Sequence, residues 1–341
     1  MKQVICIGSA SKDVFLPTAE GVVMDTPEDV TSQKKVAFEL GAKFQIENMY
    51  EAPGGCSANV SQGLARFKID VGCCSKVGDD SLGKWIISEL KKEGVDTDFI
   101  QVDSKCKSDL SHIIVDENSK DHIVFFNRDA NDKLEIFSEK ISSTEWLFLS
   151  ALNGDWVNYV EDIMSVVEDD MVRLAFNPGQ RNINSNPHVV VRMIESAEIL
   201  IVNKDEAIEV VMWMLNQKGG EIDNKDLNDE IFLMNELQGI RFGKTIVALT
   251  DGARGAWVSD GEVVLHAKSP EKKLIDTLGA GDAFSSGFLS GCIEDLDLEN
   301  CLKRGLVNGK NVTRFYGAKE GLLFLDEVEK EIEKIKVKTL I

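Results

Sequence analysis

The sequence has no surplus of basic residues and contains no long apolar runs. Its 38 lysines and arginines are outnumbered by 58 aspartates and glutamates, which gives a formal net charge of -20. This charge excludes nonspecific binding to nucleic acid or to an anionic membrane surface, so neither is expected as a partner. An anionic ligand must instead be held by local groups, such as backbone N–H groups, a metal ion or a few cations.

The longest apolar runs, 199–202 and 245–249, have only the length of a strand, and the chain starts without a signal-peptide pattern. We therefore expect a cytoplasmic protein. The seven cysteines are an odd number and show no C-x-x-C pair, so neither a disulfide framework nor a zinc site is indicated. None of the four histidines has metal-ligand spacing or a serine-nucleophile motif nearby.

Two nucleotide-binding motifs are also missing. The turn after the first apolar run lacks the glycine fingerprint of dinucleotide-binding proteins, which removes the main support for an NAD-dependent enzyme. Residues 239–245 resemble a Walker A loop but contain three intervening residues where four are needed, and they lead into a strand pattern.

Short apolar runs alternate with helical patterns along most of the 341 residues, which predicts an α/β fold with a parallel sheet covered on both faces. Strands are expected at 4–7, 146–150, 173–177, 198–202 and 245–250, and helices at 57–67, 81–92 and 205–215.

Two segments break this rhythm. Residues 33–48 and 108–128 alternate apolar and polar side chains, which is typical of antiparallel strands. We interpret them as a small β lid of residues 14–48 and 108–128 over a main domain of residues 1–13, 49–107 and 129–341. An extension of the main sheet at its edge stays open as an alternative.

The most informative motif is DTLGAGDAF at 276–284, where small residues lead into a helical pattern. Glycines and a helix N-terminus together form a site for phosphate. Asp282 would repel a bound phosphate, but beside a phosphoryl group in transfer it can accept a proton from an attacking hydroxyl. A plain helix cap is the structural alternative.

Weaker motifs end other expected strands. Thr250, Gly252 and Gly255 belong to a glycine turn that could enclose a phosphate or a ribose. Asn203 and Glu206 have capping-box spacing, and Glu206 could also orient water on Mg²⁺. Asp13 and Asn59 could bind vicinal hydroxyls, with Gly54 and Gly55 allowing close approach.

These motifs together resemble the ribokinase family, also called the phosphofructokinase-B family of carbohydrate kinases. The resemblance covers most of the chain in order, through GSASKD, GGCSANVSQGLARF, SKVGDDSLGKWIISELKKEGVDT, NPG, NKDE, TDGARG and DTLGAGDAFSSGF. It implies a Rossmann-like three-layer α/β/α sandwich with a β lid. It also implies ATP-dependent transfer of the γ-phosphoryl group to a hydroxyl of a sugar or a sugar-like molecule.

The resemblance also implies roles for individual residues. Asp282 would be the general base, Gly279, Ala280 and Gly281 the anion hole, and Thr250, Gly252, Gly255 and Asn203 the ATP site. Glu206 would serve Mg²⁺ through water, and Asp13, Gly54, Gly55 and Asn59 would bind the sugar. Family members often use a monovalent cation such as K⁺, which Asp276 and the Gly317 loop could hold.

The acceptor stays open. Ser11 stands where ribokinases proper tend to have asparagine, so ribose is in doubt. A nucleoside kinase is one alternative, and a sugar-acid kinase, with Arg128 pairing a carboxylate, is another. A nucleotide-sensing binding protein is the alternative outside enzymes. The apolar stripe Val36, Phe38, Phe44 and Ile46 could cover a nucleobase or the lid of a second copy, which would give a homodimer.

Overall fold

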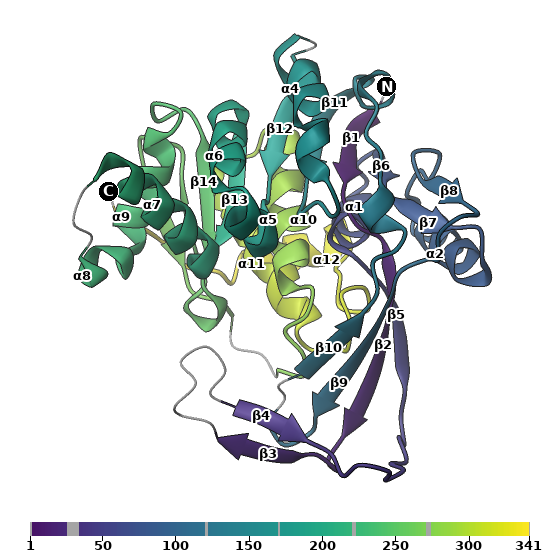
Figure 1. Ribbon diagram of the computed structural model, residues 1–341. Coiled ribbons are helices and arrows are strands. Elements are labelled where there is room, and N and C mark those ends of the chain that lie inside the picture. The colour runs from purple at the N-terminus through teal and green to yellow at the C-terminus, as the bar shows by residue number, and fades with distance from the viewer. Residues whose placement is uncertain are drawn as a thin grey trace.

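The computed structural model describes residues 2–25, 34–119, 122–169, 171–219, 223–270 and 274–340. Within these ranges, a nine-stranded sheet forms the centre of the molecule, in the order β17-β16-β15-β14-β13-β12-β11-β1-β6. The part from β14 to β6 can be followed in Figure 1. The strands of the sheet are β1 (Lys2–Ile7), β6 (Val71–Cys74), β11 (Thr144–Leu149), β12 (Arg173–Phe176), β13 (Ile199–Asn203), β14 (Ile246–Thr250), β15 (Ala256–Ser259), β16 (Val264–Ala267) and β17 (Val337–Thr339). Neighbours from β6 to β14 are parallel, and those from β14 to β17 are antiparallel.

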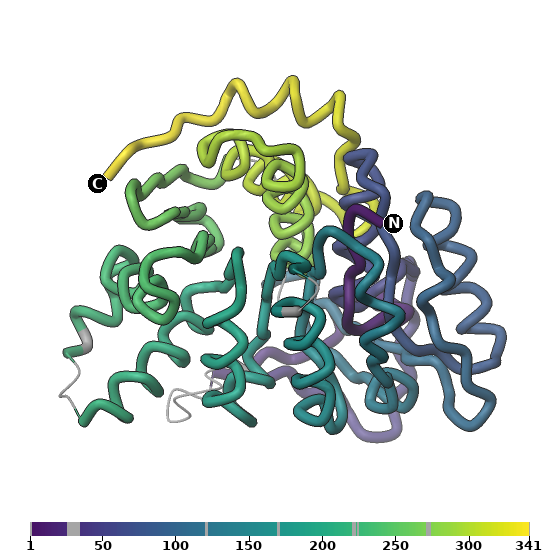
Figure 2. The backbone as a smooth tube through the Cα atoms, turned by 90° about the horizontal axis from the view of Figure 1, so that it is seen from above, coloured from purple at the N-terminus to yellow at the C-terminus, as the bar shows by residue number. Residues whose placement is uncertain are grey.

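Both faces of this sheet are apolar and covered by helices. Along β1, Val4 and Cys6 belong to one hydrophobic core and Ile5 and Ile7 to the other, and all four are fully buried. A strand with two buried faces needs such a continuous apolar run. The helices on opposite sides are visible in the view from above (Figure 2), with α10 and α11 in yellow-green and α4 in teal. The α/β/α sandwich predicted from the sequence is therefore confirmed.

The core that contains Val4 is covered by α1 (Cys56–Arg66), α2 (Ser81–Lys92), α10 (Ala280–Ile293), α11 (Leu298–Val312) and α12 (Leu325–Ile332). The core that contains Ile5 is covered by α3 (Ser138–Ile141), α4 (Val160–Asp169), α5 (Gly179–Ser185), α6 (Pro187–Ser196), α7 (Lys204–Lys218), α8 (Asn224–Leu227) and α9 (Glu230–Gly239). Short 3-10 helices lie at Asn131–Lys133, Trp156–Tyr159 and Gly252–Arg254, and β7 (Lys76–Gly78) pairs with β8 (Gln101–Asp103). The described residues include no helix of the length and apolarity that a membrane crossing requires.

A second sheet extends from the edge of the main domain at which β1 ends (Figure 1). Its order is β10-β9-β2-β5, with β2 (Ser11–Thr18), β5 (Tyr50–Gly54), β9 (Leu110–Asp116) and β10 (His122–Phe126). β9 and β10 form the antiparallel hairpin predicted within 108–128, of which 120–121 lie outside the described residues. β2 and β9 are parallel, however, and both β2 and β5 include residues that the prediction assigned to the main domain.

The prediction of a strand along 33–48 is wrong for most of that segment. Only Lys34–Ala37 forms a strand, β4, which pairs with β3 (Val22–Asp25), and residues 26–33 lie outside the described residues. Phe38 packs on Phe44 at 5.4 Å between ring centroids, and Leu40 is 99% exposed. The apolar alternation here reflects local packing around a turn at Gly41, whose φ is 83°, and does not reflect the two faces of a strand.

Candidate active site

Helix α10 begins with backbone N–H groups that have no partner. It follows Gly279, whose φ of 75° is a left-handed conformation that favours glycine. Among the described residues, the N–H groups of Gly279, Gly281 and Asp282 have no acceptor, whereas that of Ala280 donates to the Thr277 carbonyl at 3.3 Å. Free N–H groups at a helix N-terminus attract an anion. Two of the three expected anion-hole residues therefore have a free donor, and Asp282 supplies the third.

The carboxyl group of Asp282 is half-buried beside helix α1. Its Oδ2 accepts a hydrogen bond of 2.8 Å from Nδ2 of Asn59, and the Cys56 thiol is a second partner. Burial raises the pKa of Asp282 to about 6, and the negative charge of Asp13 adds to this, while the hydrogen bonds from Asn59 and Cys56 act in the opposite direction. A carboxyl group with such a pKa is mostly ionised at neutral pH and can accept a proton.

Asn59 leaves one polar atom unsatisfied. Its side chain is 7% exposed, and among the described residues its Oδ1 is buried without a hydrogen-bond partner. A buried acceptor of this kind costs free energy unless a ligand or water donates to it. The atom is therefore suited to accept a hydrogen bond from a hydroxyl of a bound molecule.

Asp282 and Asn59 both line a cavity of about 580 Å³, here called the Asp13 cavity. Its volume is that of a small-molecule site. Its lining consists of Ser9, Ser11, Asp13, Gly55, Cys56, Asn59, Asp109, Ser111, Ile113, Val124, Phe126, Asn127, Arg128, Ala151, Leu152, Asn153, Arg181, Leu278, Gly279, Gly281 and Asp282. The main domain and the second sheet thus share this cavity.

Asp13 is 8% exposed, and burial raises the pKa of its carboxyl group. The Ser11 hydroxyl donates to its Oδ1 at 3.3 Å. A Cβ atom on Gly54 would lie 2.2 Å from Asp13 Oδ2, so Gly54 provides the space for this carboxyl group. Gly55 has a φ of 92° and lines the cavity, whereas Gly54 does not. The two expected sugar-binding glycines therefore differ in how directly they reach the cavity.

A second cavity of about 370 Å³, here called the Thr250 cavity, lies on the other side of the α10 N-terminus. It is lined by Asn203, Thr250, Gly252, Ala253, Gly255, Ser269, Leu274, Thr277, Ala280, Gly281, Phe284, Leu306, Gly309, Lys310 and Thr313. All four residues expected to bind ATP are among them. Gly281 lines both cavities, and a Cβ atom on it would meet no atom within 4 Å. The two cavities therefore meet at Gly281, beside Asp282.

The order of the strands explains why these distant segments come together. Ser9 and Ala151 follow strands β1 and β11, and Asn203 and Thr250 are the last residues of β13 and β14. These four strands and β12 lie side by side in the parallel part of the sheet, in the order β14-β13-β12-β11-β1. The carboxyl ends of parallel strands lie at the same edge, where α/β proteins bind their ligands.

Asn203 and Glu206 form the capping box that their spacing predicts. The Asn203 side chain accepts from the N–H of Glu206, and the Glu206 carboxyl group accepts from the N–H of Asn203, both at 2.9 Å. Burial raises the pKa of Glu206 to about 7, and the charge of Glu209 contributes to the shift. Glu209 was missed in the sequence. It accepts from Gln180 at 2.7 Å, and its buried Oε2 has no partner among the described residues.

This donor set fits Mg²⁺ bound through water. The charge of Glu209 acts on Glu206, and Glu209 keeps one buried oxygen without a partner among the described residues. Carboxylate oxygens are the hard ligands that Mg²⁺ selects, and Mg²⁺ usually retains several water molecules. Neither Glu206 nor Glu209 lines the Thr250 cavity. The described residues also include no group of three or more His, Cys, Asp or Glu side chains that could hold a metal directly.

Asp276 and the Gly317 loop do meet, as expected for a monovalent cation site. Asp276 is 3% exposed, and its two oxygens accept from the N–H groups of Leu278 at 3.0 Å and Gly317 at 3.3 Å. The carboxyl group is thus already used to hold the loop that leads to Gly279.

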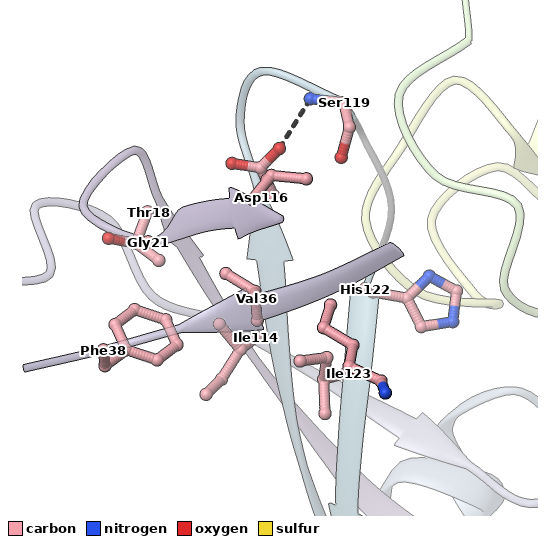
Figure 3. A pocket seen from close by; sticks show the side chains of 11 residues that line it. Thr18, Gly21, Val36, Phe38, Ile114, Asp116, Ser119, His122 and Ile123 are labelled. Atoms are coloured by element: carbon pink, nitrogen blue, oxygen red, sulfur yellow. Dashed lines mark hydrogen bonds between the residues drawn. The ribbon is translucent and has the colours of Figure 1, made fainter. Parts of the chain in front are cut away.

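A third cavity, of about 500 Å³, lies between the β3–β4 hairpin and the second sheet (Figure 3). Val36 and Phe38 line it together with Ile114 and Ile123, and it shares no residue with the Asp13 cavity. These two members of the apolar stripe therefore do not cover the Asp13 cavity. The homodimer through the lid stays a prediction.

Sequence reasoning missed Arg181 in the Asp13 cavity and named Arg128 only for a sugar acid. Arg181 lies in α5, two residues after Gly179 of the NPG motif that follows β12. The NPG motif at the end of an expected strand was the available signal, because ligand-binding residues gather at strand ends.

Comparison with known proteins agrees with this geometry. The sequence model described as pfkB family carbohydrate kinase matches residues 1–322. The chain belongs to this family of carbohydrate kinases. It is an ATP-dependent phosphotransferase that acts on a hydroxyl group, so the alternative of a nucleotide-sensing binding protein is wrong.

Two relatives and one solved structure illustrate the membership. An uncharacterized sugar kinase of Archaeoglobus fulgidus is 28% identical over 267 residues, which are 76% of this chain and 98% of that protein. An ATP-dependent ribose-1-phosphate kinase of Halopiger xanaduensis is 25% identical over 278 residues, 81% of this chain and 85% of that protein. The crystal structure of the Methanocaldococcus jannaschii nucleoside kinase is similar in fold, with a TM-score of 0.75 and 20% identity, and covers 98% of this chain and 99% of that one.

Proposed function

We propose that this carbohydrate kinase binds its acceptor in the Asp13 cavity and ATP in the Thr250 cavity, and that phosphoryl transfer takes place at Gly281. The observation that carries the proposal is that Gly281 lines both cavities while Asp282 lies beside it. A bound hydroxyl and a bound γ-phosphate are then brought together, which supplies much of the rate acceleration of such a reaction.

Asp282 acts as the general base in this arrangement. The acceptor oxygen bonds to the γ-phosphorus, the bond from this phosphorus to the β–γ bridging oxygen breaks, and ADP leaves with that oxygen. The hydroxyl proton passes to the carboxyl group of Asp282. Since a pKa of about 6 is far below that of an alcohol, the proton moves late, when bonding to phosphorus has made the hydroxyl acidic.

The free N–H groups of Gly279, Gly281 and Asp282 stabilise the negative charge that the transferred group carries. Glu206 and Glu209 would hold Mg²⁺ through its water shell, and the ion would supply charge neutralisation at the phosphates. Asp276 contributes by fixing the Gly317 loop, and K⁺ beside it remains a secondary proposal.

The second sheet serves as a lid over the Asp13 cavity. Val124 and Phe126 line this cavity from β10, yet they are 36% and 55% exposed. Closing the sheet over a bound acceptor would bury these apolar side chains and exclude water, which limits hydrolysis of ATP.

A nucleoside is the second candidate acceptor, since Phe126, Val124 and Ile113 form an apolar patch that could cover a base. The test is ATP consumption with Mg²⁺ across neutral pentoses and hexoses, sugar acids, sugar phosphates and nucleosides, with product detection by mass spectrometry. We expect a phosphorylated product from at least one sugar class, formed at least ~100-fold more slowly by Asp282→Asn. If the wild-type protein binds ATP but consumes none with any of these acceptors, the proposal is contradicted.

A further inference from the structure

We propose that the acceptor carries an anionic group, a carboxylate or a phosphate, which Arg128 and Arg181 bind in the Asp13 cavity. This inference rests on the proposed function, because it assumes that the acceptor occupies that cavity. The two residues determine specificity and take no part in the chemistry at Asp282.

Arg128 and Arg181 differ from the other arginines of the chain in their lack of hydrogen-bonding partners among the described residues. The chain has nine arginines. Five pair with carboxylates, namely Arg66, Arg173, Arg192, Arg254 and Arg304. Arg241 and Arg314 donate to a carbonyl and an amide oxygen. In the part of the chain that the structure describes, only Arg128 and Arg181 have no hydrogen-bond acceptor or ion pair, and both line the Asp13 cavity.

A shortage of carboxylates does not explain this pattern, because acidic residues outnumber basic residues by 58 to 38. Asp109 lines the same cavity, but it is 2% exposed and accepts from Asn131 at 2.6 Å and from the N–H of Ala130 at 2.9 Å. Arg128 and Asp13 influence each other only through space. Two guanidinium groups therefore keep their donors unused in a strongly acidic protein.

The surroundings prepare both groups for an anion. The Arg128 guanidinium lies 4.6 Å from the centroid of the Phe126 ring, an arrangement that holds its plane while its N–H groups stay available. Asn127 accepts from the N–H of Leu110 through its Oδ1, so its amide N–H₂ group remains a donor. Asn153 also lines the cavity. A group with several acceptor oxygens matches this set of donors.

The nucleotide does not explain these arginines, because neither residue lines the Thr250 cavity. They also come from different parts of the fold. Arg128 follows strand β10 of the second sheet, whereas Arg181 lies in α5 of the main domain. An anion bound between them would connect the lid to the main domain, so an anionic acceptor would also favour closure.

The test compares steady-state kinetics of wild type, Arg128→Gln, Arg181→Gln and Arg192→Gln. Arg192 is the matched control, since it also loses a guanidinium but pairs with Glu161 at the surface. The acceptors are a neutral hexose, a sugar acid and a sugar phosphate of similar size. We expect the wild type to prefer one of the two anions. Each cavity variant should raise KM for that anion at least ~10-fold, with kcat within a few-fold and Arg192→Gln unchanged.

The results distinguish the possibilities. Preference for the sugar acid identifies a carboxylate subsite, and preference for the sugar phosphate identifies a phosphate subsite. A wild type that prefers the neutral hexose, with unchanged KM in both variants, would overturn the inference and leave the proposed function standing. A fall in kcat alone for every acceptor would also overturn it, because the arginines would then act on the transferred phosphoryl group. Failure of all acceptors would contradict the proposed function itself.

Discussion

Asn59 donates a hydrogen bond of 2.8 Å to Asp282, and its other polar atom, Oδ1, is buried without a partner among the described residues. One amide thus orients the carboxyl group that would take a proton and offers an acceptor to the hydroxyl that would lose it. The two residues stand 223 positions apart in the sequence. The packing of α1 beside α10 brings them together.

The pH dependence of the reaction follows from the pKa of Asp282, which is raised to about 6. Because the base must be ionised, kcat/KM should fall about tenfold per pH unit below 6 and level off above it. Asp282→Asn should lower turnover at least ~100-fold and abolish this fall in kcat/KM, here called the acidic limb of the pH profile. A pH profile with an acceptor that does not titrate near pH 6 checks both. Near-normal turnover in the variant would exclude Asp282 as the base.

Asn59→Ala should move the acidic limb to higher pH. The hydrogen bond from Asn59 lowers the pKa of Asp282, so its loss leaves burial and the charge of Asp13 to raise that pKa further. KM for the acceptor should also rise, since Oδ1 is lost. The same substitution made in the Asp282→Asn protein serves as the control and should produce no further change in the pH profile. A limb that moves to lower pH would contradict this account.

Gly281→Ala should impair catalysis and leave the fold intact. Its Cβ atom would enter open space where the two cavities meet, and alanine is a better helix former than glycine. Gly255→Ala is the matched control, because its Cβ atom would lie 2.0 Å from the Ala267 carbonyl oxygen at a φ of 96°. We expect Gly255→Ala to lower the free energy of unfolding by about 2 kcal/mol or more. Thermal unfolding and kcat/KM are measured for both variants. Full activity of Gly281→Ala would contradict the proposed role of Gly281 in catalysis.

Glu206→Gln should raise the Mg²⁺ concentration needed for half-maximal activity several-fold. Glutamine can still accept the N–H of Asn203, so the capping box is retained while the charge is lost. Glu327→Gln is the control, because Glu327 has the same capping position in α12, where it accepts from the N–H of Phe324 at 2.8 Å. Titration of Mg²⁺ at fixed ATP checks the prediction. An equal response of the two variants would remove Glu206 from the Mg²⁺ site.

The parallel part of the main sheet was predictable because its strands are buried on both faces. Such strands read as continuous apolar runs, and all five expected strands occur, with ends shifted by no more than about two residues. Strands β3 and β17 were not predicted from the sequence, and β4 is only a short part of the strand predicted along 33–48. They contain three or four residues each, and β17 lies within a charged stretch that favours a helical interpretation.

The candidate site was predictable where a motif combines a backbone requirement with chemistry. The glycines before Asp282 predict a helix that begins with free N–H groups, and helix α10 begins there with N–H groups at Gly279 and Gly281 that are free within the described part of the chain. The N–H group of Ala280 donates to the Thr277 carbonyl instead. This hydrogen bond depends on the local turn, which no motif in the sequence indicates. Arg181 was missed although the NPG motif stands just before it, because its approach to the cavity depends on how α5 packs.

Gly281 lines both the Asp13 cavity and the Thr250 cavity. With ATP and the acceptor bound in these two cavities, as proposed, both substrates would be present at once and the phosphoryl group would pass directly between them, with no phosphorylated enzyme as a carrier. Double-reciprocal plots at several fixed ATP concentrations should accordingly intersect, and a molecule that tethers the acceptor to an adenosine polyphosphate should compete with both substrates.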